Sequence, residues 1–564
     1  MQNAECRRQK RRESVFCLLP SAFCILVSCS TPPPPPPVPA PPRAAAPQLV
    51  TTGAAKRVVL VSFDGLGADE VQRFGAPSFE QMPVRVARVI PVEPTATSST
   101  HAAILTGQTP DQTGIVSNIY HAPGTPRDAV ARGLDSDIAV ETIVDVARRA
   151  GKRVGSIAFP FYDWASPRHS TDFGIGWSMP LTRPRVIHLT HDDFHPNWLP
   201  PTWGTPSARH PSYSTVMRTR IAWSAPNAAS EDVDLVAYDS TNDNVTNYDT
   251  FFVEAGGIES PVDAKRWFAV SEQGFGSWSK ILNFDPSLAS MTIYWGAISR
   301  TRGDAAFVRE IDEKIGFWPG AADEVSARTG EIGADTLTDQ NERLADFLTR
   351  VADYAMTTRD FDLLLVYEPI VDTAQHQFLT PAGEPVRRAA MAAFDRAVAI
   401  FRRDAGGAIV ITGDHGLAPV DTEVHLTRIL KDWNEPQWSA FANGNVVHFY
   451  RFSGDDDTDA LVNKLTTLRA PDGALVFERV DRKTAQSHPN SGDLVAFAYP
   501  RFALTSANGD PFVKPPYAGQ HGGLNSHPEF HTTLGAEGVM IPPQKIEAMP
   551  QTGIAPFIER LLGL

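Results

Sequence analysis

Three apolar runs, at residues 58–63, 363–367 and 408–413, constrain the fold of this chain more than any other feature. No charged side chain interrupts any of them. A strand that is apolar throughout is buried on both faces, which is typical of a parallel sheet covered by helices. Apolar residues also recur at helical spacing over 339–354, before the second run, and over 385–403, before the third. The pattern predicts an α/β sandwich with a mainly parallel central sheet.

Acidic residues directly follow two of these runs. Asp64 comes after the first run, and Asp414 and His415 come after the third. Open α/β sheets bind their ligands at the carboxyl ends of strands, so these positions favour function. An Asp that ends a strand is also a common turn former or helix cap, and Asp64 alone has that structural interpretation as well.

Three further motifs carry side chains suited to metal chemistry or to nucleophilic attack. Thr97 opens a Ser/Thr-rich stretch that could equally be an ordinary loop. Asp372 and His376 are four residues apart, which places them on one helical face and also suits a simple hydrogen bond. His521 lies in a Gly-rich segment, and two nearby histidines could exchange roles with it, namely His527 and His531.

Together these motifs supply three Asp, three His and one hydroxyl. The full set is Asp64, Thr97, Asp372, His376, Asp414, His415 and His521. Zinc accepts imidazole nitrogen and carboxylate oxygen, and a hydrolytic site leaves coordination positions open for substrate. The set therefore predicts a site for two Zn²⁺ ions.

The order of the motifs resembles the alkaline phosphatase superfamily and, within it, the nucleotide pyrophosphatase/phosphodiesterase family. The resemblance covers residues 57–118 and 362–538, and it includes a Thr followed by His and an apolar run ending in Thr-Gly at 97–107. Gly-Ile-Val-Ser-Asn at 114–118 is a further signature. The resemblance implies an alkaline phosphatase-like α/β/α sandwich, with Thr97 as the nucleophile and Asn118 as a donor to a phosphoryl oxygen.

The same resemblance implies how the ligands divide between the two metals. One zinc takes Asp372, His376 and His521, and the other takes Asp64, Asp414, His415 and the Thr97 oxygen. Coordination stabilises the alkoxide, so we expect in-line attack, a phospho-threonine intermediate and its hydrolysis by water. The Asn118 amide and the Ser98 backbone N–H are expected to stabilise the equatorial oxygens.

The N-terminus predicts export and a lipid anchor. Five basic residues lie within 7–12, and an apolar segment at 15–27 follows them, as in a signal peptide. Leu-Val-Ser-Cys at 26–29 resembles a bacterial lipobox, which makes Cys29 the acylation site in a leader of residues 1–29; a plain signal peptide is the alternative. We expect a lipoprotein of the bacterial cell envelope, in the outer membrane or on the periplasmic face. All four cysteines fall in this leader, so disulfides and zinc-thiolate sites are excluded beyond it.

Composition divides the remaining chain. Residues 30–54 are rich in Pro and Ala and predict an extended tether. Residues 55–183 and 320–564 are assigned to the catalytic domain. Between them, residues 184–319 are rich in aromatic and turn-forming side chains, with one strand predicted near Val233 and Leu235 and a returning strand at 248–253. We interpret this segment as a β-rich insertion that caps the site.

Charge and the nucleophile motif bear on the substrate. The formal net charge is −14, and the leader holds five basic and two acidic residues, which leaves the rest near −17 and argues against nucleic acid as a partner. Members that cleave nucleotides usually follow the nucleophile with Phe-Pro-Asn, whereas residues 98–100 here are Ser-Ser-Thr.

We therefore expect a metal-dependent phosphodiesterase or pyrophosphatase that acts on a small phosphate ester or nucleotide. The alternative is a phosphomonoesterase, for which Arg168 is the nearby candidate cation. A binding lipoprotein that has lost catalysis is a remote alternative.

Overall fold

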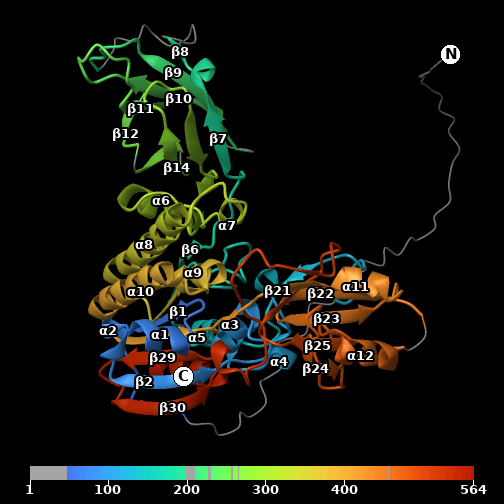
Figure 1. The fold of residues 1–564 in the computed structure, drawn as a ribbon. Helices are drawn as coiled ribbons and strands as arrows, with labels where there is room; N and C mark the ends of the chain where they lie inside the picture. The colour runs from blue at the N-terminus through green and yellow to red at the C-terminus, as the bar shows by residue number, and fades with distance from the viewer. Residues whose placement is uncertain are drawn as a thin grey trace, which may run out of the picture. The chain divides into compact units, whose positions relative to one another are not determined.

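The computed structural model describes residues 48–196, 210–225, 230–255, 258–264, 266–272, 274–454 and 457–564 (Figure 1). All of them belong to one compact unit. The predicted leader with Cys29, and the tether up to residue 47, lie outside the described residues. Among the residues that are described, no helix combines the length and the apolar character needed to cross a membrane.

A nine-stranded sheet forms the centre of the fold. The strand order is β17 (Arg302–Gly303), β6 (Phe173–Gly176), β5 (Val154–Ile157), β18 (Leu363–Glu368), β1 (Val58–Phe63), β19 (Ala408–Gly413), β29 (Thr532–Glu537), β2 (Val84–Ile90) and β30 (Gln544–Pro550). From β6 to β19 all neighbouring strands are parallel, whereas β29 runs antiparallel to both β19 and β2. The prediction of a mainly parallel sheet is confirmed.

Helices cover both faces of this sheet. One set is α8 (Ala334–Thr358), α9 (Ile370–Phe378) and α10 (Glu384–Asp404), and the other is α3 (Thr97–Thr106), α5 (Ile143–Arg149) and α13 (Ile554–Leu562). The two helices predicted from periodicity are confirmed as α8 and α10, and both are longer than the pattern indicated. Strands β1, β18 and β19 are buried along their whole length, as their continuous apolar sequences require.

The segment that follows β6 builds two antiparallel sheets with a hydrophobic core of their own. One has the order β12 (Ile258–Val262), β11 (Thr250–Ala255), β10 (Ser230–Tyr238), β9 (Met217–Ser224) and β8 (His195–Pro196). The other has the order β13 (Trp267–Glu272), β14 (Phe275–Phe284), β15 (Met291–Trp295) and β7 (Arg185–Leu189). The strand predicted near Val233 is β10, and it pairs antiparallel with the predicted returning strand, β11.

Residues 422–513 form a separate seven-stranded sheet that the sequence patterns did not distinguish. Its order is β24 (Phe477–Arg482), β25 (Leu494–Ala498), β23 (Val446–Arg451), β22 (Trp438–Gly444), β26 (Phe502–Thr505), β21 (Thr422–His425) and β27 (Phe512–Val513). Helices α11 (Leu426–Asp432) and α12 (Thr458–Thr467) pack against it and share its hydrophobic core. This sheet matters for function because β22 ends beside the site described next.

Candidate active site

Strand register brings the predicted metal ligands together at the carboxyl ends of the central strands. Phe63, the last residue of β1, pairs with Glu368 on one side and with Gly413 on the other. Asp64 and Asp414 therefore directly follow the paired ends of two neighbouring strands. Helix α9 begins just after β18, and the backbone N–H of Asp372 in its first turn donates to the Asp64 carbonyl at 3.0 Å. Three carboxylates thus meet at the carboxyl ends of three adjacent parallel strands.

Asp64 is buried, and its two carboxylate oxygens have different surroundings. Oδ2 accepts a hydrogen bond from the hydroxyl of Tyr367 at 2.5 Å. Oδ1 lies 3.4 Å from His415 Nε2 and has no hydrogen-bond partner. The sequence reasoning missed Tyr367 because it ends an apolar run that was assigned to the core alone. One oxygen is therefore fixed by the protein, and the other is left for a cation.

His415 is fully buried at the centre of the cluster. Its Nε2 lies 3.2 Å from Asp414 Oδ2, and its ring stacks on that of His521 with centroids 3.8 Å apart. The two alternative histidines lie elsewhere: His527 is bound to Glu478 and His531 to the Asn525 carbonyl. His521 is accordingly the histidine of this segment that reaches the cluster.

Backbone carbonyls orient the two remaining histidines. His521 Nδ1 donates to the Thr95 carbonyl at 3.2 Å, and His376 Nδ1 donates to the Gly519 carbonyl at 2.9 Å. A ring whose Nδ1 is protonated presents Nε2 as a free acceptor, which is the usual arrangement for metal-binding histidine. The Nε2 of His376 lies 3.3 Å from Asp372 Oδ2, so these two side chains face each other on α9.

The hydroxyl of Thr97 faces the same cluster. Thr97 is the first residue of α3, and its Oγ1 lies 3.1 Å from His415 Nε2. Its carbonyl accepts a hydrogen bond from Nδ1 of the buried His101 at 2.8 Å, and His101 Nε2 is 2.9 Å from the Ser62 hydroxyl. His101 Nδ1 is also 3.3 Å from Asp414 Oδ2. The helix start that carries Thr97 is thus tied to strands β1 and β19.

Asn118 lies beside Thr97, with its amide already engaged. Its Oδ1 accepts from the backbone N–H of Ser98 at 2.9 Å, and its Nδ2 donates to Asn443 Oδ1, at the end of β22, at 3.1 Å. The Ser98 N–H, expected to contact substrate, here orients Asn118 instead. An amide nitrogen carries two hydrogens, so Asn118 keeps one donor for a ligand. Sequence patterns did not identify Asn443.

The electrostatic environment of the clustered carboxyl groups and histidines favours binding of cations. Burial raises the pKa of Asp64, Asp372 and Asp414, and for Asp372 and Asp414 the charge of Asp64 raises it further. Burial lowers the pKa of His521 to about 3 and that of His415 well below its usual value, so their rings are neutral ligands at ordinary pH. In the part of the chain that the structure describes, the ion-pair partners of these carboxylates are histidines alone.

Two groups of three ligand atoms lie within 4.8 Å of one another. They are Asp64, Asp414 and His415, and Asp372, His415 and His521. His415 belongs to both groups, whereas the expected division gives it to one metal and places His376 with the other. Asp64 Oδ1, Asp372 Oδ1 and His415 Nδ1 are buried without a hydrogen-bond partner. Unpartnered buried carboxylate oxygens beside neutral histidines fit divalent metal ions, and zinc is compatible with this donor set.

A pocket of about 600 Å³ opens over the cluster. The site residues Asp64, Thr97, Asn118, Asp372, His376 and His521 line it. Three arginines that sequence patterns did not single out also line it, namely Arg132, Arg302 and Arg328. Arg168, the sequence candidate for a phosphate clamp, is instead held by Asp137 at 3.2 Å and is not among the lining residues.

Comparisons with known proteins identify a family and similar folds. The family model described as type I phosphodiesterase/nucleotide pyrophosphatase matches residues 58–524. No curated protein matches the chain in sequence. Murine ectonucleotide pyrophosphatase/phosphodiesterase 5, solved in an inactive form in complex with AMP, is similar in fold, with a TM-score of 0.51, 15% identity, and coverage of 90% of this chain and 95% of that one. The human protein of the same name gives a TM-score of 0.50, 14% identity and the same coverage.

Proposed function

The chain belongs to the type I phosphodiesterase/nucleotide pyrophosphatase family of the alkaline phosphatase superfamily, and from this premise we propose that it is a zinc-dependent phosphodiesterase with Thr97 as its nucleophile. The family is metal-dependent, and membership supports a phosphoester hydrolase. One observation carries the proposal: the Thr97 hydroxyl lies 3.1 Å from the neutral His415, beside the buried carboxylates of Asp64 and Asp414. That arrangement combines a nucleophile with a receptor for divalent metals.

In the proposed reaction, Thr97 Oγ attacks phosphorus in line with the departing alcohol. The bond from phosphorus to the leaving oxygen breaks, and the remaining phosphoryl group is held as an ester of Thr97. A water molecule then attacks phosphorus, the Thr97 oxygen leaves, and a phosphate monoester is released. Two zinc ions, held by the ligand set above, would supply positive charge at the attacking and leaving oxygens.

The side chains around Thr97 position it for this attack. His101 fixes the Thr97 carbonyl, which sets the first turn of α3 and hence the direction of the hydroxyl. Asn118, held by Ser98 and Asn443, lines the pocket, and its remaining N–H would donate to a phosphoryl oxygen as charge develops there. The N-terminus of α3 adds a favourable dipole for the same negative charge.

The charges in the pocket favour a diester over a monoester. A monoester carries an additional negative charge, and superfamily members that cleave monoesters add cationic groups for it. Here Arg302 lies 3.6 Å from Asp163, and Arg328 lies 3.9 Å from Glu324, so two of the three lining arginines face a carboxylate. The alternative, a phosphomonoesterase, rests on Arg132, which lines the same pocket and is exposed.

The test compares kcat/KM for bis-p-nitrophenyl phosphate and p-nitrophenyl phosphate on the zinc-loaded protein. We expect the diester to be preferred. Thr97→Ala should lower kcat/KM by at least about a thousandfold because the nucleophile is removed. Thr97→Ser retains a hydroxyl and should keep most of the rate. Activity unchanged in Thr97→Ala would sink the mechanism. Preference for the monoester, lost in Arg132→Ala, would instead establish the phosphatase alternative.

We further propose that the protein is exported and anchored by a lipid on Cys29, in the outer membrane or on the periplasmic face of the envelope. The support is the basic and apolar leader and the lipobox-like residues 26–29, all of which lie outside the described residues. Wild-type protein made in a Gram-negative host should partition into detergent, and Cys29→Ser should not. Equal partition of the two proteins would remove the anchor from the proposal.

A further inference from the structure

The pocket over the ligand cluster is larger than a phosphoryl group requires. Its volume of about 600 Å³ lies within the range of pockets that enclose whole small-molecule ligands. Beyond the ligand cluster, much of its wall is apolar and is formed by Leu134, Phe159, Phe161, Trp177 and Met179. The pocket therefore has room and a suitable surface for a group attached to the phosphate.

Two of these apolar side chains are exposed at the mouth of the pocket. Leu134 is 37% exposed and Met179 is 60% exposed, and Leu181, two residues after Met179, is 40% exposed. Single exposed apolar side chains are common on protein surfaces, but two that line the same pocket offer a surface that a ligand can cover. The rim offers apolar contact where a substrate enters.

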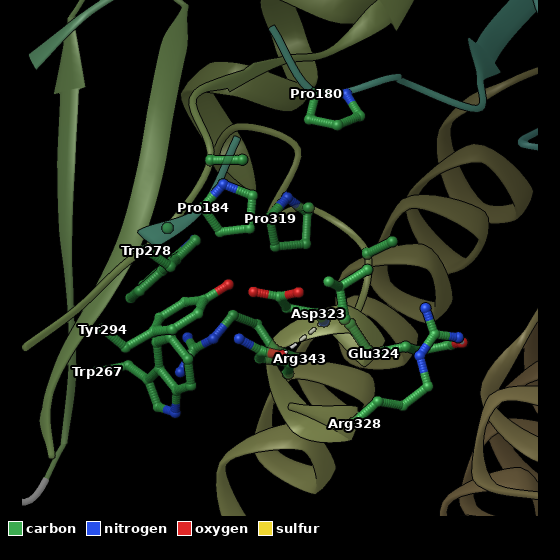
Figure 2. Close-up of a pocket in the computed structure, with 17 residues that line it drawn as sticks. Pro180, Pro184, Trp267, Trp278, Tyr294, Pro319, Asp323, Glu324, Arg328 and Arg343 are labelled. Atoms are coloured by element: carbon green, nitrogen blue, oxygen red, sulfur yellow. Dashed lines mark hydrogen bonds and ion pairs between the residues drawn. The ribbon is translucent and has the colours of Figure 1, made fainter. Parts of the chain in front are cut away.

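A second pocket, of about 270 Å³, is drawn in Figure 2 and has two lining residues in common with the first. Figure 2 shows Trp278 and Tyr294 of the β-rich segment on one side, and Asp323, Glu324 and Arg328 on the other. Glu324 and Arg328, in α7 (Glu324–Arg328), line both pockets. Met179 lines the first pocket, and its neighbour in the chain, Pro180, lines the second. The two pockets therefore share the wall formed by α7.

Charged groups of the second pocket are paired only in part within the protein, since Asp323 Oδ2 and Arg343 Nε are buried without a hydrogen-bond partner. Arg328 lies 3.9 Å from Glu324, and the guanidinium of Arg343 lies 4.0 Å from the centre of the Trp278 ring. Trp267, Trp278, Tyr294 and three prolines are among the remaining lining residues. Met179 of the first pocket and Pro180 of the second are consecutive in the chain, so apolar side chains lie on both sides of the boundary between the pockets, beside the Glu324–Arg328 pair that lines both.

We propose that the second ester group of the substrate, the one not expelled by Thr97, is extended and apolar, lies on Leu134 and Met179, and reaches the aromatic pocket of the β-rich segment. This rests on the proposed function, since it names the substrate class of the same site. It gives the β-rich segment a role in substrate choice: its strands β13, β14 and β15 supply Trp267, Trp278 and Tyr294. Both an alkyl chain and an aromatic ring have the required chemistry.

The test measures kcat/KM of the full chain, in a fixed concentration of detergent, on p-nitrophenyl phosphodiesters that differ in the second group. The groups are methyl, butyl, hexyl, decyl, phenyl and thymidine 5′-yl. Each methylene that is buried should raise kcat/KM, by up to about fourfold when burial is complete. We expect the hexyl ester to exceed the methyl ester by at least about tenfold, and comparison with phenyl shows whether the site prefers a chain or a ring.

Variants locate the path of the group. Leu134→Ser and Met179→Ser should each lower the hexyl-to-methyl ratio severalfold. Val325→Ser, in the wall of the second pocket, should lower the decyl-to-butyl ratio and leave the butyl-to-methyl ratio nearly as it is. Val539→Ser is the matched control, because Val539 is 98% exposed and lines neither pocket. Thermal melting of each variant checks that it is folded.

Three results would overturn the inference while leaving the phosphodiesterase intact. They are a flat series of rates across the alkyl esters, a thymidine ester that is cleaved faster than every apolar ester, and ratios that the Leu134 and Met179 substitutions do not change. Failure to cleave any diester, with zinc bound and the protein folded, would refute the proposed function itself.

Discussion

At the scale of single residues, the orientation of the Asp64 carboxylate depends on the hydroxyl of Tyr367, which ends an apolar run. Tyr367 is buried in β18 and donates to Asp64 Oδ2 at 2.5 Å. Burial, followed by the charge of Asp64, raises the pKa of Tyr367 well above its usual value, so the hydroxyl stays protonated and remains a donor. Because Oδ2 is held in this way, Oδ1 is directed toward His415 and the position of a metal. A partner that orients a ligand is often as important as the ligand.

Tyr367→Phe should weaken zinc binding about 10- to 100-fold and lower kcat/KM at limiting zinc. The phenyl ring keeps the edge contacts with His101 and Trp177, so the fold should be preserved. Zinc titration against a chromophoric chelator measures the affinity directly. Tyr354→Phe is the control, since that hydroxyl bonds to Glu310, a residue that lines neither pocket. Equal zinc affinity in wild type and Tyr367→Phe would show that the hydroxyl does not hold Asp64 for the metal.

At the scale of elements, the site depends on how closely helix α9 approaches the end of strand β1. Gly65 follows Asp64 with φ +68°, and a Cβ placed there would lie 2.6 Å from the Cα of Asp372. Gln375 of the same helix donates to the Gly65 carbonyl at 2.6 Å. A glycine at this position therefore permits both the left-handed turn and the contact that places Asp372 beside Asp64.

Gly65→Ala should destabilise the protein by about 2–5 kcal/mol, combining backbone strain with displacement of α9, and should abolish zinc binding at the Asp372 position. Gly75→Ala is a matched control because Gly75 has φ +71° and nothing within 4 Å of an added Cβ. It should show the backbone strain alone, about 1–3 kcal/mol. Urea unfolding and zinc titration separate the two effects. If both variants lose the same stability and bind zinc equally, close approach of α9 is not what Gly65 provides.

Three strands of the central sheet, β1, β18 and β19, were predictable because each carries its own local signal. The runs that became β1, β18 and β19 are apolar throughout, and the helices before β18 and β19 have a clear period. The seven-stranded sheet was not predicted because its pairing is non-local: β26, near residue 503, lies between β22 and β21. Asn443 could not be assigned to the site for the same reason, since only this sheet brings it to Asn118. Side chains such as Met179 and Arg132 carry no sequence signal of their own.

At the scale of the whole molecule, the candidate site concentrates carboxylates that form no ion pair with a Lys or Arg among the described residues. Asp64, Asp372 and Asp414 share one cluster, and their ion-pair partners among the described residues are histidines. Burial raises the pKa of all three carboxyls above the usual value near 3.8. Such groups bind protons more tightly in the folded than in the unfolded state. Without metal, their contribution to stability is fully present below the unfolded pKa and is lost as pH rises through the folded pKa.

The metal-free and zinc-loaded proteins should therefore respond differently to pH. Zinc replaces the protons, so the difference in Tm between the two forms should widen from about pH 5 to about pH 8. Zinc at a hundredfold excess over its Kd should raise the free energy of unfolding by about 2.7 kcal/mol. Calorimetry with and without a chelator measures the Tm of the two forms at each pH. In the metal-free state at about pH 8, Asp372→Asn should melt above wild type because one buried charge is removed, although it binds zinc less well. A Tm difference that is constant over this range, or an Asp372→Asn protein less stable than wild type without metal, would show that the fold already compensates these carboxylates.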